Sequence, residues 1–419
     1  MRRVLLFSII FVFLLHPFLK AEEIFLTLDE AVAIALRDNR DILLKAEDVK
    51  KAKEKIKEAK AGLLPTLNFT GSWTDTSGFY SKDLTQATTQ TTLKQYLYKG
   101  GKIINTIKYN GYNFEVAQAI LDKTKIETLL NIKKAFFTLL LAQDFTQLNK
   151  GILDNTQAHL DFLRRRYENG QASESDVLGV KSSLSSVEEA YEASLNQIEA
   201  SKALLRNLLY LDENVEVKPN GDFNYESTEI AYDEAFLKAM KMRPEIRQYE
   251  AQEQANKKSI EIAKSDNRAN IYASWDYYSR SHVSATTQRN WNDYNVLGLT
   301  FTWPIFDGWA TKAKVEQAIV DLKEAQLTKE KTVKDIALEL KNAYIDLKNA
   351  IAKMQSTLDA INLYKDTLKV TEDKYKHGLV SSLDLDDATL SYQVSLFNQR
   401  QAVYDYIIAK AKFDKATGG

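Results

Sequence analysis

The turn YKHGLVSSLD, residues 375–384, repeats an earlier turn of the same chain, YENGQASESD, residues 167–176. Both contain the pattern Tyr-x-x-Gly-x-x-Ser-x-x-Asp, and a constant offset of 208 residues relates them. A second pair of residues, Gly100 and Gly308, keeps the same offset. A constant offset over such a distance indicates that the chain contains an internal duplication.

Each copy of this turn connects two long predicted helices. Apolar residues on both sides of it recur in alternating steps of three and four, the period of a supercoiling helix. The glycine ends one helix and the serine starts the next, so the short turn makes the two helices antiparallel. We therefore predict two helical hairpins, at 102–210 with its tip near 168–174 and at 309–415 with its tip near 376–382. A helix of about 65 residues is roughly 100 Å long.

The far end of each hairpin has a different pattern, as in PTLNFTGSWTD, where apolar and polar residues alternate. This period of two predicts strands with one apolar face, at 66–75, 88–98, 269–278 and 294–303. For any single strand, a soluble hairpin packed on a helix is the simpler interpretation. Four such strands at the ends of two long rods favour a transmembrane barrel, because two hairpins alone cannot cover their apolar faces in water.

Four strands are too few to close a barrel, which takes about eight. Backbone groups in lipid require closure, so we predict an oligomer. Two copies would give a barrel filled by its own side chains, and three would leave room for a lumen. The predicted fold is mainly α with a membrane β-barrel part. It has two tandem repeats, 22–229 and 230–419, each ordered helix–strand–strand–long helical hairpin.

The first residues have the composition of a secretory signal peptide, predicted at 1–21. Two arginines precede a short apolar run, and Ala21 offers a small residue for cleavage. The run is shorter than the about 20 residues that span a bilayer. The chain contains no cysteine, so we expect neither a disulfide nor a cysteine-linked lipid. No apolar span of helix length follows, which excludes a helical inner-membrane protein. The chain also lacks the excess of positive charge that is typical of nucleic-acid-binding proteins.

The sequence also predicts that the protein is not an enzyme and has no metal and no other cofactor. Three histidines follow the predicted signal peptide, His159, His282 and His377, and they are far apart in the sequence. Neither a nucleophile motif nor a phosphate-binding glycine loop occurs. The chain encodes no energy source, so partners must drive any active transport.

With its duplication and its order of elements, the chain resembles the TolC family of outer-membrane efflux proteins over nearly all of residues 26–416. The stretch LDLDDAT at 383–389 is similar to a family motif. LTLDEAVAIALRDNRDI and IAYDEAFLKAMKMRPEI resemble the short helix and turn that open each family repeat. Arg40 stands where the family usually has a proline, whereas Pro244 keeps it.

This resemblance implies a homotrimer with a twelve-stranded barrel in the outer membrane of a Gram-negative-type cell. The barrel continues into an α-helical coiled-coil tunnel across the periplasm. The implied function is the exit duct of a tripartite efflux or type I secretion system, with a periplasmic adaptor and an inner-membrane transporter as partners. The alternative is a secreted coiled-coil structural or adhesin protein without a pore, which accounts for the heptads but not for the strands. Neither interpretation identifies the cargo.

The resemblance also implies roles for residues at the hairpin tips. Asp384 and Asp387 would line the pore entrance, and Tyr375 and Asp176 would make contacts that hold it closed. The family arginine that assists this closure falls at Val380. Helix capping is the competing role for Asp176 and Asp384, because each completes a Ser-x-x-Asp box. Asp387 completes no such box and is the better pore candidate.

Two further sets of residues are candidates. The exposed turns would meet the adaptor through Gly170, Gly378, Ser173 and Ser381, although the glycines also fit left-handed helix stops. Aromatic residues at strand ends suit a girdle at the membrane interface, or else a protein core; these are Trp73, Trp275 and Trp303.

Overall fold

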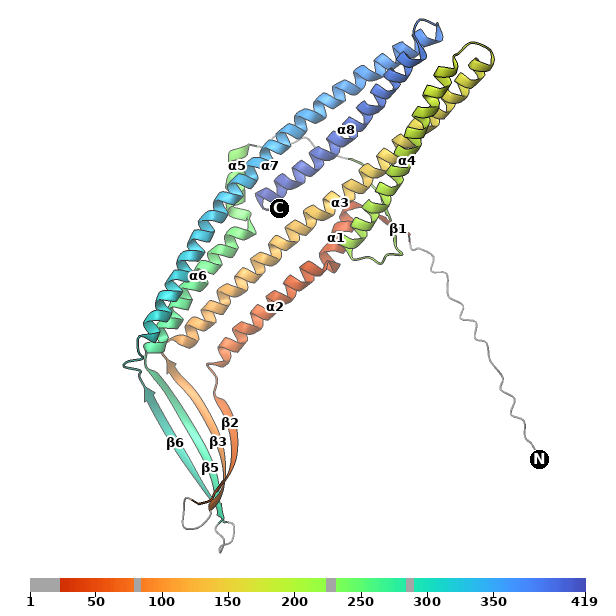
Figure 1. Ribbon diagram of the computed structural model, residues 1–419. Helices are drawn as coiled ribbons and strands as arrows, with labels where there is room; N and C mark the ends of the chain where they lie inside the picture. The colour runs from red at the N-terminus through yellow and green to blue at the C-terminus, as the bar shows by residue number, and fades with distance from the viewer. Residues whose placement is uncertain (1–22, 79–83, 224–230, 284–289) are drawn as a thin grey trace, which may run out of the picture. The chain divides into compact units, whose positions relative to one another are not determined.

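The computed structural model describes residues 23–78, 84–223, 231–283 and 290–419 (Figure 1). The predicted signal peptide lies outside these residues. The chain divides into two compact units, one within 1–33 and 135–222 and the other within 34–134 and 223–419. Helices α1 (Leu28–Asp38) and α3 (Lys102–Glu168) run from one unit into the other. The units therefore do not follow the two repeats proposed from the sequence.

The first unit contains a helical hairpin and a small sheet. Helix α4 (Glu174–Leu209) returns along the last part of α3, and Leu160 and Leu163 of α3 pack with Leu184 of α4. Strand β1 (Glu23–Leu26) pairs in parallel with β4 (Glu216–Pro219). Sequence alternation does not predict this pair, because four residues are too few to establish a period.

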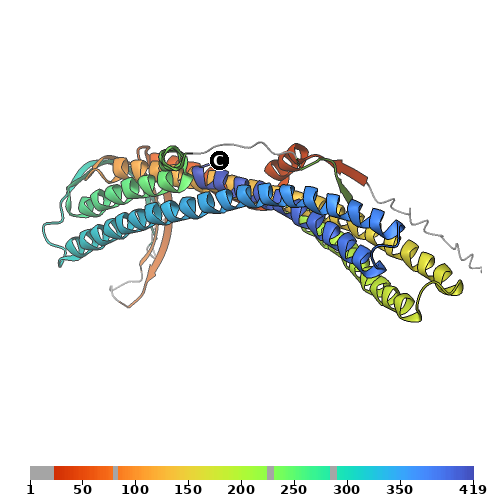
Figure 2. The same cartoon turned by 90° about the horizontal axis from the view of Figure 1, so that it is seen from above.

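The second unit holds the second hairpin and several shorter helices. These helices are α2 (Arg40–Ala61), α5 (Tyr232–Met242), α6 (Pro244–Lys264), α7 (Ala310–Lys376) and α8 (Ser382–Thr417). Helices α7 and α8 are antiparallel, and α6 lies along the first part of α7 (Figures 1 and 2). The core of this unit is built from Leu340 and Leu347 of α7, Tyr406 and Phe413 of α8, and alanines of α5.

The heptad seam predicted for α7 is only partly the buried face. Leu340 and Leu347 of this seam are buried, but so are residues that lie off it, among them Ile336, Ala343 and Ala350. Helix α7 packs against α5 and α6 as well as α8, so its buried face is wider than a two-helix seam. The alternating steps of three and four therefore predict the helix and its pairing with α8 more reliably than they predict which individual residues are buried.

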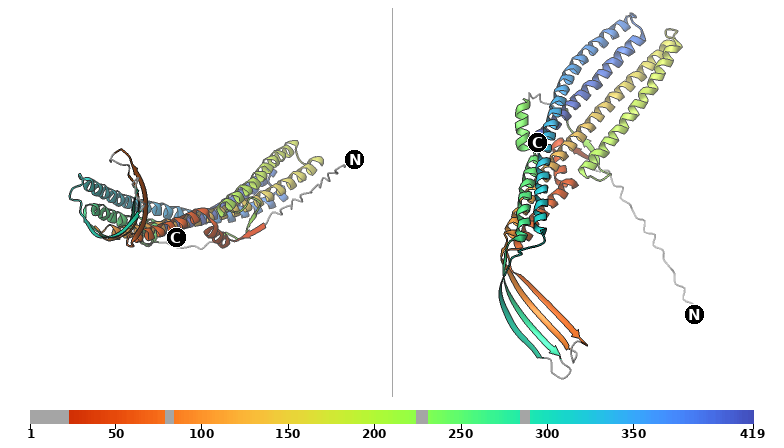
Figure 3. Two further views of the ribbon diagram at one scale, coloured as in Figure 1. Left: turned by 90° about the horizontal axis from the view of Figure 1, so that it is seen from below. Right: turned by 60° about the vertical axis from the view of Figure 1, so that its left-hand side comes forward.

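The second unit also contains a four-stranded antiparallel sheet (Figure 3). Its strands are, in spatial order, β2 (Thr66–Thr76), β3 (Leu84–Lys99), β5 (Asn270–Val283) and β6 (Asn290–Thr302). The sheet is curved, and its strands lead into the ends of α2, α3, α6 and α7. Strands β2 and β6 are the two edges, and neither has a second neighbour in the part of the chain that the structure describes.

None of the helices in the described part of the chain combines the length and the apolar composition needed to cross a membrane.

Candidate functional site

The tip of the second hairpin is held by a reciprocal hydrogen-bonded cap. Asp384 donates its backbone N–H to Ser381 Oγ over 3.2 Å, and Ser381 N donates to Asp384 Oδ2 over 2.8 Å. The Ser381 hydroxyl donates to the same carboxylate oxygen over 2.7 Å. These side-chain and backbone hydrogen bonds lower the pKa of Asp384. The Asp384 carboxylate thus has a structural role in capping the N-terminus of α8.

The tip of the first hairpin has the same cap. Asp176 N donates to Ser173 Oγ over 3.1 Å, and Ser173 N donates to Asp176 Oδ2 over 3.0 Å. Backbone and side-chain hydrogen bonds from Ser173 lower the pKa of Asp176. Both carboxylates are exposed, so the capping geometry leaves them accessible to solvent.

The preceding helices end in the same way in both copies. Gly170 and Gly378 have φ values of 70° and 71°, in the left-handed region where a side chain is strained. The glycine N–H groups donate to the carbonyls of Tyr167 and Tyr375 over 2.9 and 3.0 Å. In each copy the next residue donates to the carbonyl five positions before it, which completes a Schellman motif. The two turns are thus alike in hydrogen bonding as well as sequence.

The remaining tip candidates differ from these capping residues. Asp387 lies in the first turns of α8 and is exposed, and its side chain has no hydrogen bond or ion pair among the described residues. Tyr375 is half-buried in the last turn of α7. The second tip therefore brings together Tyr375, Gly378, Ser381 and both pore-entrance candidates. The first tip brings together Gly170, Ser173 and Asp176.

The sheet has one apolar and one polar face, as the alternation predicts. A row of neighbouring residues crosses the four strands at Leu67, Leu93, Trp275 and Leu297. The four side chains of this row are apolar and exposed, and Leu297 is 83% accessible. An exposed patch of this kind marks a contact with a membrane or with another protein.

The opposite face carries polar side chains bonded to one another. Asp276 accepts hydrogen bonds from Thr92 Oγ1 at 2.5 Å and from Gln90 Nε2 at 3.0 Å. Gln90 Nε2 also donates to the Tyr278 hydroxyl over 2.9 Å, and Tyr278 stacks on Tyr294 with 4.9 Å between ring centres. A face of this composition suits water rather than lipid.

The predicted girdle residues lie at different heights on the sheet. Trp73 shares a cross-strand row with Trp291, at the end far from the helices, and sequence reasoning missed Trp291 because its neighbours are polar. Trp303 lies at the helix end, where its Nε1 donates to the carbonyl of Asn267 over 3.3 Å. Trp275 lies within the strand, in the apolar row described above. All four are exposed.

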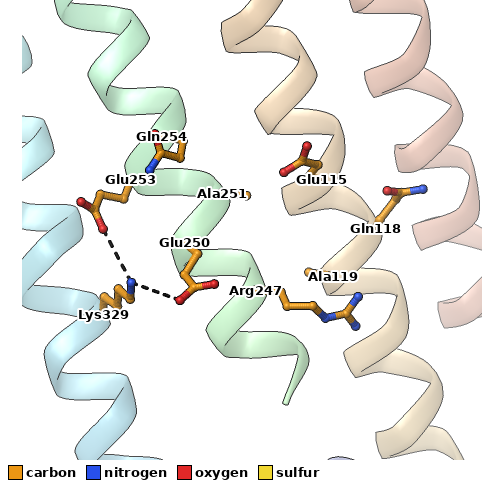
Figure 4. Close-up of a pocket in the computed structure, with 9 residues that line it drawn as sticks. All are labelled: Glu115, Gln118, Ala119, Arg247, Glu250, Ala251, Glu253, Gln254 and Lys329. Carbon is orange, nitrogen blue, oxygen red and sulfur yellow. Dashed lines mark ion pairs between the residues drawn. The ribbon is translucent and has the colours of Figure 1, made fainter. Parts of the chain in front are cut away.

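A groove of about 530 Å³ lies between α3, α6 and α7 (Figure 4). Its lining is mixed in charge and includes Glu115, Arg247 and Lys329. Lys329 pairs with Glu250 at 3.4 Å, and Arg247 Nη2 pairs with Asp122 at 2.9 Å. Because its cations are already paired with carboxylates of the same unit, the groove does not have the chemistry of a catalytic or anion site.

A buried arginine that the sequence analysis overlooked fixes the base of α8. Arg243 is 4% exposed and pairs with Glu339 at 2.7 Å and with Glu245 at 3.0 Å. Its Nη1 donates to the carbonyls of Lys415 and Ala416, at 3.4 and 3.2 Å. The guanidinium thus caps the C-terminal end of α8 from the α5–α6 turn. The dipeptide Arg-Pro marks a turn in the sequence, but it does not indicate that the arginine is buried.

Among the described residues there is no group of three or more side chains suited to hold a metal ion.

Comparison with known proteins agrees with these features. The sequence matches the family described as Outer membrane efflux protein over residues 31–209 and 237–419. It is 22% identical to the outer membrane protein TolC of Escherichia coli over 411 residues, which are 91% of this chain and 80% of TolC. It is 21% identical to the alkaline protease secretion protein AprF of Pseudomonas aeruginosa over 323 residues, 73% of this chain. That alignment spans 65% of the length of AprF.

The fold matches that of solved outer-membrane channels. The Campylobacter jejuni outer membrane channel CmeC superposes with a TM-score of 0.81 at 17% sequence identity. The match covers 93% of this chain and 85% of CmeC. At this identity, the likeness describes the fold.

Proposed function

The chain belongs to the outer membrane efflux protein family, and from this premise we propose that three copies form a channel through which solutes leave the cell. The observation that supports this most directly is the isolated four-stranded sheet. It has an exposed apolar row and two edges that pair with no further strand of the described residues. Such a sheet is incomplete alone, because in lipid the backbone N–H and C=O groups of an edge strand need hydrogen-bond partners from another strand.

Copies of the chain complete the sheet by pairing β6 of one copy with β2 of the next. Two copies would give eight strands and a barrel filled with side chains, and three give twelve strands and a lumen. We favour three, because the polar face of the sheet carries a connected set of hydrogen bonds suited to water. In this arrangement Leu297 and its row face lipid in the outer membrane.

The helical hairpins then extend from the barrel into the periplasm, and solutes enter at their tips. The Asp387 side chain has no partner among the described residues, so three copies would present a ring of free carboxylates. Asp384 adds a second ring while it caps α8. Rings of carboxylates in a narrow passage favour cations over anions. Tyr375 and Asp176 are the proposed contacts that keep the passage closed, and splaying of the tips opens it.

The tips are also the proposed contact for a periplasmic adaptor. Gly170, Ser173, Gly378 and Ser381 lie in exposed turns of matching geometry, so one type of adaptor surface can engage both turns. An inner-membrane transporter supplies the energy, because the chain contains no motif for nucleotide binding. The relatives include a protein named for protease secretion, which makes a type I secretion duct one of the forms that this function takes.

Single-channel recording of the purified protein in a planar bilayer tests this proposal. Wild type is compared with Asp387→Asn and Asp384→Asn. We expect small cation-selective steps in wild type, and a loss of selectivity that is larger in Asp387→Asn. Steps that are unchanged by either substitution would limit both aspartates to structural roles. No steps, from a protein that is soluble without detergent, would favour a secreted coiled-coil protein instead.

A further inference from the structure

Two lysines and two tyrosines lie in contact on the polar face of the sheet. Lys94 Nζ is 3.8 Å from the centre of the Tyr272 ring and 4.9 Å from that of Tyr96. Lys99 Nζ is 4.5 Å from the centre of the Tyr96 ring. The two rings meet edge to face at 5.7 Å. These contacts stabilise both ammonium groups and hold them in place.

The strand register puts this lysine–tyrosine cluster on the face opposite the apolar row. Lys94 pairs with Ser274, and Tyr96 pairs with Tyr272. Trp275, the next residue after Ser274, belongs to the apolar row, and successive side chains of a strand point to opposite faces. The cluster lies toward the helix end of the sheet, because Lys99 is the last residue of β3 and α3 begins at Lys102.

The positive charge of the cluster is not neutralised within the described part of the chain. Neither Lys94 nor Lys99 forms an ion pair there. Asp276 is the carboxylate of the polar face, and it accepts its hydrogen bonds from Thr92 and Gln90. Arg280, further along β5 on the same face, adds another cation without a carboxylate partner among these residues. The polar face of the strands therefore has more cations than anions.

We propose that the lysine–tyrosine cluster is a binding site for multivalent anions, such as solutes that carry several phosphate or carboxylate groups. This inference rests on the proposed trimer, in which the polar face lines the lumen and each copy contributes two ammonium groups to one ring. Fixed cations in a passage with walls of low dielectric raise the local concentration of anions. The ring lies where the lumen passes from the helices into the barrel.

This site is opposite in sign to the tip of the second hairpin. A solute moving outward meets the carboxylates of Asp384 and Asp387 first, and then the ammonium groups of Lys94 and Lys99. The tip therefore acts against anions and the cluster retains them. A duct with both rings discriminates at two positions rather than one, and each can be changed without the other.

Block of the channel by inorganic tripolyphosphate tests the proposal. The anion is added to the barrel side of the wild-type trimer in a planar bilayer at 0.1 M KCl, and the concentration for half block is measured. Lys94→Gln/Lys99→Gln is compared with Lys94→Arg/Lys99→Arg, which keeps the charge and the contact with the rings. We expect the glutamine variant to require about tenfold more tripolyphosphate, and the arginine variant to resemble wild type. Block should weaken at 1 M KCl, where the screening length is about 3 Å.

The possible results separate this inference from the proposed function. Equal block in wild type and in the glutamine variant, with normal steps in both, would overturn the anion site and leave the channel intact. The absence of steps from wild type would overturn the channel itself. If the double glutamine variant gives no trimer, Lys94→Gln alone is measured, and unchanged block in this variant would likewise contradict the site.

Discussion

Arg243 donates a hydrogen bond of 3.2 Å from Nη1 to the backbone carbonyl of Ala416, which ties the α5–α6 turn to the end of α8. The same guanidinium pairs with Glu339 on α7. Three helical segments that are far apart in the sequence thus meet at one buried cation. Gly418 lies close beside it, because a Cβ at this position would be 2.8 Å from Met242 Cβ.

Replacement of Arg243 is expected to be strongly destabilising. Arg243→Met leaves the mostly buried Glu245 without its partner and Glu339 with Lys415 alone, and breaking a buried pair costs about 3–5 kcal/mol. Arg247→Met is the matched control, since this exposed arginine pairs with Asp122 and its loss costs less than about 1 kcal/mol. Thermal unfolding of the two variants in detergent gives the comparison. Equal unfolding temperatures would contradict a structural role for Arg243.

The same cluster is expected to make stability depend on pH. Burial raises the pKa of Glu339, but hydrogen bonds from Lys415 and Arg243 outweigh it and lower the pKa overall. Folding therefore favours the ionised carboxylate, and this contribution is present above the ordinary pKa of about 4.3. It is lost as the pH falls below that value. Glu339→Gln should flatten the acid limb of a plot of unfolding temperature against pH, and an unchanged limb would contradict the assignment.

The two serine caps are expected to hold the starts of the return helices. Ser381→Ala removes the acceptor for Asp384 N, and Ser173→Ala removes the acceptor for Asp176 N. Loss of an N-cap of this kind should speed amide exchange in the first turn about fivefold. Hydrogen–deuterium exchange with mass spectrometry measures it. Ser382→Ala, beside the cap residue, is the control, and equal exchange in Ser381→Ala and Ser382→Ala would contradict capping.

The tyrosines at the ends of α3 and α7 allow a matched test of the gate. Tyr375→Ala should increase conductance, because the proposed closing contact is lost. Tyr167→Ala changes the corresponding residue of the first turn, which is 46% exposed, and should leave conductance near that of wild type. Single-channel recording distinguishes the two. Similar conductance in Tyr375→Ala and wild type would show that another residue closes the passage.

The orientation of the sheet can be tested with two neighbouring residues of β6. Leu297 lies on the apolar face and Val296 on the polar face, and both are exposed in the single chain. A lysine facing lipid near the middle of the membrane costs about 2–4 kcal/mol, so Leu297→Lys should abolish the outer-membrane trimer. Val296→Lys should be tolerated, because in the proposed trimer this side chain would face the lumen. Membrane fractionation followed by electrophoresis of unheated samples measures the amount of trimer in the outer membrane for both variants. Equal amounts for Leu297→Lys and Val296→Lys would contradict the assigned faces.

Period-two alternation locates most of the sheet, and period-seven patterns locate the long helices. The strand predicted at 66–75 lies at Thr66–Thr76, and the helical tips lie at the predicted turns. Strand β3 is longer than predicted, from Leu84 to Lys99, because its first four residues, LTQA, do not alternate between apolar and polar. The mainly helical fold follows from these local signals.

Contacts between distant segments were not predictable in the same way. The cluster around Arg243 joins α5, α7 and α8, and no local pattern connects an arginine at one turn to carbonyls 172 and 173 residues away. The capping roles of Asp176 and Asp384 were accessible, since a Ser-x-x-Asp box acts within four residues. The lysine–tyrosine cluster was hidden because its members lie on two strands from different halves of the chain.

The anchor at Arg243 also gives α7 mechanical leverage. From Glu339 to the end of α7 at Lys376 the helix is roughly 55 Å long at 1.5 Å per residue. A tilt of about 5° at the anchored end of such a rod displaces its far end by about 5 Å, close to the 5.4 Å pitch of one helical turn. A small tilt of α7 at the Arg243–Glu339 pair is therefore amplified into a displacement of several ångströms at the hairpin tip, where the proposed entrance lies.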